Sequence, residues 1–73
     1  DGKEDLKQKI DEYTRQIKEN PNDAKYYYNR GGLYSDLQQY ERAVQDYNKS
    51  IELNPNSGFA KHFRDMCLQA MGK

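Results

Sequence analysis

The chain has 73 residues, which is enough for one domain and too few for a large internal ligand cavity. Leu, Ile, Val and Phe together number only eleven, and seven tyrosines compensate, because each Tyr can bury its ring while its hydroxyl stays in water. Twelve basic and twelve acidic side chains cancel, so the sequence lacks the broad basic surface of a protein that binds nucleic acid or an anionic membrane.

Cysteine content and hydropathy indicate where such a chain resides. The single cysteine, Cys67, excludes an intrachain disulfide. No apolar run approaches the roughly 18 residues of a membrane span, and no signal-peptide pattern opens the chain. We therefore expect a soluble protein of a reducing, cytoplasmic compartment, with no cofactor and no nucleic-acid or membrane partner.

The first two expected helices cover residues 4–19 and 23–37. Each carries apolar or small residues three and four positions apart, which places them on one helical face. These residues are Leu6, Ile10, Tyr13 and Ile17 in the first helix and Ala24, Tyr27, Gly31 and Tyr34 in the second. Pro21 disfavours helix at the residue before it, and Asp23 is then the expected N-cap of the second helix.

The third and fourth expected helices cover residues 40–53 and 57–71, separated by Pro55, with Ser57 as the expected N-cap. The third helix has a clear stripe, formed by Tyr40, Ala43, Val44, Tyr47, Ser50 and Ile51. The polar residues between them are expected to face solvent: Glu41, Arg42, Gln45, Asp46, Asn48 and Lys49.

An internal repeat relates the helices to one another. Residues 13–23 (YTRQIKENPND) and 47–57 (YNKSIELNPNS) share five of eleven positions at an offset of 34 residues. The same offset pairs Arg30 with Arg64. A period of 34 residues is typical of helix–turn–helix repeats.

Residues 24–57 resemble one complete tetratricopeptide repeat. The resemblance rests on "YYNRG" at residues 27–31, on "SIELNP" at residues 50–55, and on Tyr34, Tyr40, Ala43 and Tyr47 in the family's places. It implies an all-α fold of antiparallel helical hairpins, stacked as a short right-handed α-solenoid of four helices. Residues 1–22 would be the second helix of a partial repeat, 23–56 a complete repeat and 57–73 a C-terminal helix. One departure is Gln38, which stands where the family often has Gly.

Small residues indicate where the hairpin helices approach each other. Gly31 and Ala43 are expected at the helix crossing, where a larger group costs about 1 to 3 kcal/mol through overpacking. Gly31 and Gly32 are unfavourable inside a helix, and close packing is the simplest explanation for both.

The two ends of the repeat pattern are more polar than its centre. Lys9 and Gln16 occupy the places of Ala43 and Ser50, while Lys61, Arg64 and Asp65 replace Tyr27, Arg30 and Gly31. A polar outer face is what the terminal helix of a soluble solenoid needs, so we expect a self-contained stack.

The resemblance implies a concave groove lined by the second and fourth helices, and we expect it to bind a peptide or a partner helix. The implied positions in the second helix are Lys25, Tyr28, Asn29, Gly32, Ser35 and Asp36. Those in the fourth helix are Phe59, His62, Phe63, Met66 and Ala70. The competing interpretation is that Phe59, Phe63, Met66 and Ala70 are core residues, which is the commoner role of such a stripe. Some co-chaperone members grip a C-terminal carboxylate, and only Asn29 matches that set, so we expect no such clamp.

The sequence predicts a non-catalytic interaction module or scaffold. His62 and Cys67 lie five residues apart, on different sides of a helix, which is a poor arrangement for a base and a nucleophile. A metal site lacks a second His or Cys, and Cys67 is expected in the core. The alternative is a structural or self-associating minimal repeat unit without a dedicated ligand, natural or engineered, in which the apolar stripe packs on a second copy as a homodimer.

Overall fold

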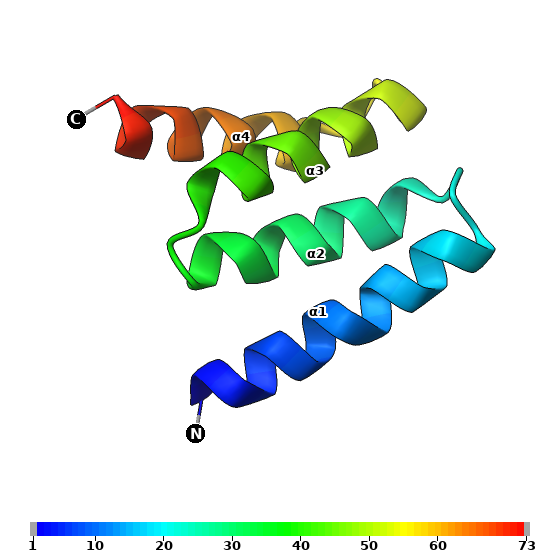
Figure 1. The fold of residues 1–73 in the computed structure, drawn as a ribbon. Helices are drawn as coiled ribbons and strands as arrows, with labels where there is room; N and C mark the ends of the chain where they lie inside the picture. The colour runs from blue at the N-terminus through cyan, green and yellow to red at the C-terminus, as the bar shows by residue number, and fades with distance from the viewer. Residues whose placement is uncertain (1, 73) are drawn as a thin grey trace.

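The computed structural model describes residues 2–72 and contains four helices in this range, with no strand. They are α1 (Gly2–Glu19), α2 (Ala24–Asp36), α3 (Tyr40–Leu53) and α4 (Gly58–Met71). Each helix packs against the next one along the chain, and α2 also touches α4 (Figure 1). The stack measures 30 × 29 × 15 Å, so it is flat. The all-α, repeat-like fold class is therefore confirmed; Asp1 and Lys73, the ends of the expected domain, lie outside the described residues.

The expected N-caps are present at α2 and α4. The Asp23 carboxylate accepts a bond from the backbone N–H of Lys25 at 3.0 Å, and the Ser57 hydroxyl accepts one from Ala60 at 3.4 Å. Both caps satisfy a backbone donor that a helix start leaves unpaired. The bounds of α2, α3 and α4 differ from the expected ones by at most one residue, while α1 begins two residues earlier.

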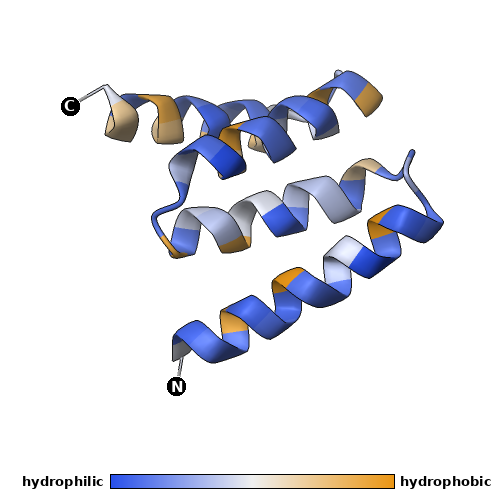
Figure 2. Cartoon of the chain, viewed as in Figure 1, coloured by the Kyte–Doolittle hydropathy of each residue, from blue (hydrophilic) through white to orange (hydrophobic). Residues whose placement is uncertain are grey.

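Tyrosine supplies much of the core, as the composition predicts. Tyr47 is only 3% exposed and packs in a buried cluster with Ala43, Ala60 and Cys67. Partly buried side chains surround this cluster: Tyr28, Tyr34, Tyr40, Val44 and Ile51. In Figure 2 much of α2 is pale, intermediate between hydrophilic and hydrophobic, because tyrosine and glycine rather than aliphatic residues fill its packed face. The prediction that Cys67 is a core residue is confirmed.

Gly31 lies at the crossing of α2 and α3, as predicted. A Cβ atom on Gly31 would lie 3.1 Å from Tyr47 Cε1 and 3.3 Å from the carbonyl oxygen of Ala43, so the absence of a side chain allows this approach. Gly32 differs. A Cβ atom there would meet only the Tyr47 hydroxyl at 3.7 Å, an ordinary contact, so the expectation that close packing requires Gly32 is wrong.

The turn between α2 and α3 retains a compact geometry although Gln38 occupies the position where glycine is common. Gln38 has a φ of 62°, in the left-handed region that favours glycine. Its N–H donates to Ser35 O at 2.9 Å, and Gln39 N–H donates to Tyr34 O at 2.9 Å. These two bonds form a Schellman motif with Gln38 at C′, so the turn has a regular helix ending at the expense of backbone strain.

Asp46 contradicts the expected polar face of α3. It was expected to face solvent, yet it is 5% exposed and accepts two bonds of 2.7 Å from Arg30 of α2. The guanidinium also donates to Thr14 of α1 at 3.2 Å. Asp46 is buried because this pairing compensates for the loss of water around its charge.

Candidate functional site

Helix α4 carries a row of solvent-exposed apolar side chains. Phe59 is 74% exposed, Met66 51% and Phe63 36%, and Ala70 is exposed too. The interpretation of this stripe as core is therefore wrong. The residues of α4 that pack inward are Ala60 and Cys67, which lie on a different side of the helix.

A groove lies between α2 and α4 and collects most of the expected site residues. One wall is formed by α2 and the other by Phe63 and Met66 of α4, while Tyr47 of α3 lies between them. The α2 residues that line it are Tyr28, Asn29, Gly32, Leu33, Ser35 and Asp36. Seven residues of the expected binding set thus line one groove: Tyr28, Asn29, Gly32, Ser35, Asp36, Phe63 and Met66.

Three aromatic rings form the apolar part of the groove. The ring centroids of Tyr28 and Tyr47 lie 5.9 Å apart, those of Tyr28 and Phe63 6.3 Å, and those of Tyr47 and Phe63 6.4 Å. These are favourable distances for aromatic pairs. Burial raises the pKa of Tyr47 to about 12, so its hydroxyl stays neutral at physiological pH.

The α2 side of the groove is polar. The side-chain amide of Asn29 has no hydrogen-bond partner among the described residues, so it is available to a ligand. The Ser35 hydroxyl accepts a long bond of 3.6 Å from the Cys67 thiol, and Asp36 supplies a negative charge to the lining. The groove therefore offers apolar area on one side and hydrogen-bonding groups with a negative charge on the other.

Four expected site residues do not line the groove: Lys25, Phe59, His62 and Ala70. Lys25 is exposed at the start of α2, and Phe59 projects into solvent beyond the lining. His62 is exposed and packs edge-on against Phe63 with centroids 5.3 Å apart. Conversely, Leu33 and Tyr47 line the groove without having been expected there. Helical periodicity assigned Tyr47 to the core, and it fills both roles because its ring separates the core from the groove.

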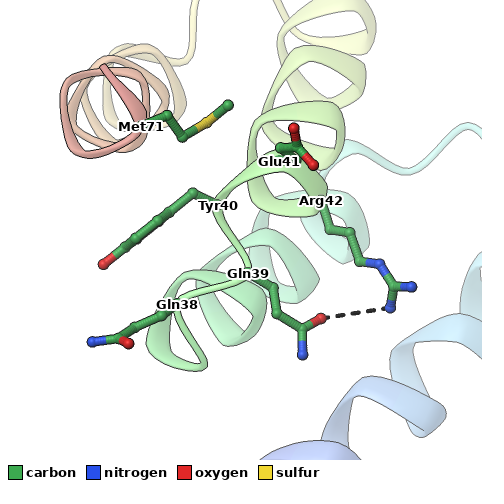
Figure 3. Close-up of a pocket in the computed structure, with 6 residues that line it drawn as sticks. All are labelled: Gln38, Gln39, Tyr40, Glu41, Arg42 and Met71. Carbon is green, nitrogen blue, oxygen red and sulfur yellow. Dashed lines mark hydrogen bonds between the residues drawn. The ribbon is translucent and has the colours of Figure 1, made fainter. Parts of the chain in front are cut away.

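Another recess lies where the α2–α3 turn faces the end of α4 (Figure 3). Its lining is Gln38, Gln39, Tyr40, Glu41, Arg42 and Met71. Figure 3 shows Arg42 turned toward Gln39, with a bond of 3.5 Å, and Tyr40 projecting below Met71. Tyr40 and Met71 are the large apolar side chains of this lining, and it contains none of the expected site residues. The α2–α4 groove, with three packed rings, is the better candidate for a binding site.

The described residues contain no cluster of three or more His, Cys, Asp or Glu side chains able to hold a metal ion. Within residues 2–72, no helix combines the length and the apolar character that crossing a membrane requires.

Comparison with known proteins gives matches over most of the chain. Residues 24–57 match the family model described as "Tetratricopeptide repeat". The Protein SGT1 homolog of Bos taurus is 40% identical over 58 residues, which cover 80% of this chain and 17% of that protein. Hsp70-Hsp90 organizing protein 1 of Glycine max is 46% identical over 43 residues, covering 59% of this chain and 8% of that protein.

A catalytic protein is also among the similar ones. The UDP-N-acetylglucosamine--peptide N-acetylglucosaminyltransferase of Giardia intestinalis is 39% identical over 57 residues, which are 78% of this chain and 4% of that enzyme. The chain thus spans less than a fifth of the length of these relatives.

Proposed function

Residues 24–57 are a tetratricopeptide repeat, and from that premise we propose that the chain is a non-catalytic protein-binding module whose ligand occupies the α2–α4 groove. The observation that carries the proposal is the groove itself. Met66, half exposed, and Phe63 form an apolar wall opposite Asn29 and Asp36. An exposed apolar row next to unpaired polar groups is the arrangement that peptide-binding surfaces use.

The lining specifies the chemistry of the ligand. An amphipathic helix or an extended peptide would place an apolar side chain between Phe63 and Met66, and its amide groups against Asn29. Asp36 favours a basic residue in the same ligand. Among the described residues no Lys or Arg lines the groove, so a C-terminal carboxylate is a poor fit. One similar protein is named for organising Hsp70 and Hsp90, which is consistent with a polypeptide as the partner.

A peptide display screen tests this proposal. The purified chain is used to select peptides from a random library, and the selected peptides are measured by isothermal titration calorimetry. Met66→Glu places a charge on the apolar wall, and we expect it to weaken binding at least about tenfold. The matched control is Leu68→Glu, which changes another exposed apolar residue of α4 outside the groove and should alter binding less than about twofold.

The contradicting outcomes are distinct. A library that gives no binder, or binders whose affinity is unchanged by Met66→Glu, would show that the groove is not the binding site. Circular dichroism of each variant separates a loss of binding from a loss of folding. Phe59→Gln extends the test, because a loss with this variant would show that the ligand reaches past the groove toward the start of α4.

A self-associating scaffold is the second candidate, and the same exposed row on α4 favours it. If Phe59, Phe63 and Met66 pack against their own copies, the protein forms a dimer with two-fold symmetry. Sedimentation velocity would then show a mass that stops rising at the dimer, and Phe63→Glu would weaken this dimer. A monomer at all concentrations would remove this candidate.

A further inference from the structure

The outermost helices of the stack each have a face with no helix against it among the described residues. Helix α1 packs on α2 and α4 packs mainly on α3, and Figure 1 shows them at opposite edges of the stack. At an offset of 34 residues, α1 corresponds to α3 and α4 corresponds to α2. A pairing of α4 with the α1 of another molecule would therefore correspond to the α2–α3 hairpin inside the repeat.

Arg64 on α4 repeats half of the hydrogen-bond network of Arg30. In the hairpin, the Arg30 guanidinium donates to Thr14 on the preceding helix at 3.2 Å and to Asp46 on the following helix at 2.7 Å. Arg64 donates to Asn48 at 3.4 Å, and Asn48 is the 34-residue equivalent of Thr14. What Arg64 lacks is a counterpart of Asp46, and it has instead only a 3.2 Å pair with the adjacent Asp65.

The counterpart of Asp46 at the same offset is Glu12 on α1. Glu12 is exposed, and it makes no ion pair with any described residue. It retains the acidic character of Asp46 at the place where a neighbouring arginine would approach. The geometry therefore offers Arg64 of one molecule a carboxylate on α1 of the next.

Three further positions of the α4–α1 pairing agree. Asp65 on α4 corresponds to Gly31, and Lys9 on α1 corresponds to Ala43. Gly31 and Ala43 meet at the hairpin crossing, and Asp65 and Lys9 carry opposite charges. Leu68 and Leu6 correspond to Tyr34 and Tyr40, which both pack against the core. Lys61 and Gln16 correspond to Tyr27 and Ser50. Each position thus pairs opposite charges, two apolar groups, or a charge with a neutral amide. None of the compared positions places like charges together.

We propose that the chain associates head to tail, with α4 of one copy packing on α1 of the next in the manner of the α2–α3 hairpin, through Arg64 with Glu12 and Asp65 with Lys9. Asp65 and Lys9 are larger than Gly31 and Ala43, so the helices stay farther apart and the association is weak. Because the two surfaces differ, the contact is heterologous and adds copies without closing at a dimer.

Sedimentation velocity at low salt tests the proposal. The concentration series should extend to about 1 mM, where an association with a binding free energy of about 4 kcal/mol is populated. The mean mass should rise past the dimer, and added salt should reverse the rise. Arg64→Glu and Glu12→Arg each place like charges at the joint and should weaken association at least about tenfold. An equimolar mixture of R64E and E12R should associate again, because the unchanged Glu12 of one meets the unchanged Arg64 of the other.

Arg15→Glu is the matched control for Arg64→Glu. It makes the same charge change at an exposed position of α1 outside the joint, and it should leave association unchanged. Circular dichroism confirms that each variant is folded. A wild-type chain that is monomeric at every concentration would overturn the proposal. It would indicate that flanking segments or other proteins cover these faces. Two other results would also overturn the proposal. One is a mass that stops rising at the dimer and is lowered by Phe63→Glu but not by Arg64→Glu. The other is a mixture of R64E and E12R that fails to associate.

Discussion

Arg30 on α2 and Asp46 on α3 form a two-point ion pair in which both N–O distances are 2.7 Å. The side chains are 19% and 7% exposed, so the pair lies mostly out of water. The hydrogen bond to Asp46 raises the pKa of the Arg30 guanidinium, so it remains charged. Through Thr14, which in turn donates to Ile10 O at 2.8 Å, the network joins three helices.

Removing the acid from this pair should destabilise the fold. Asp46→Ala leaves Arg30 charged and mostly buried, and we expect the free energy of unfolding in urea to fall by about 2 to 3 kcal/mol. Glu52→Ala is the control, because it breaks an exposed pair with Lys49 and should cost less than about 1 kcal/mol. If both variants lost the same stability, the Arg30–Asp46 pair would have no special role.

Much of this fold could be predicted from the sequence, and Asp46 illustrates what could not. Proline breaks, capping residues and the 34-residue offset place the helices within one or two residues. Periodicity assigns polar residues to the solvent side, so it cannot identify a carboxylate that is buried because a distant arginine pairs with it. The side of α4 that faces outward was equally undetermined, because Phe59, Ala60, Phe63 and Cys67 all belong to apolar rows, and only packing against α3 decides which row is buried.

The two adjacent glycines of α2 should respond in opposite directions to the same substitution. Gly31→Ala gains helix propensity but places a methyl group 3.1 Å from the Tyr47 ring and 3.3 Å from a backbone oxygen. We expect a net loss of about 1 kcal/mol, since overpacking exceeds the gain in propensity. Gly32→Ala has ordinary contact distances and should add about 0.5 to 1 kcal/mol. Urea denaturation of both variants checks the signs, and a stabilising Gly31→Ala would contradict the close approach.

The strained turn residue offers a stabilising substitution. Gln38 holds a φ of 62° to complete the Schellman motif, and glycine adopts this conformation without a Cβ clash. We expect Gln38→Gly to raise the free energy of unfolding by about 0.5 to 1 kcal/mol, after allowing for the greater entropy of the unfolded chain. Gln39→Gly is the control, because Gln39 has a φ of −92° and gains nothing from glycine. Thermal melts should therefore shift upward for Gln38→Gly only.

Tyr47 should make the stability of the fold depend on pH in the alkaline range. Burial raises its pKa from 10.0 to about 12, which means that the folded state holds the phenolic proton more tightly than the unfolded state. The resulting contribution is fully present below pH 10 and is lost as the pH rises toward about 12, at up to about 1.4 kcal/mol per pH unit. Tyr47→Phe keeps the ring and removes the proton. The difference in unfolding free energy between wild type and this variant should be constant from about pH 7 to pH 9 and should then move in favour of the variant. A difference that stays constant through about pH 11 would show that Tyr47 ionises in the folded state as easily as in water, and hence that its hydroxyl is not buried.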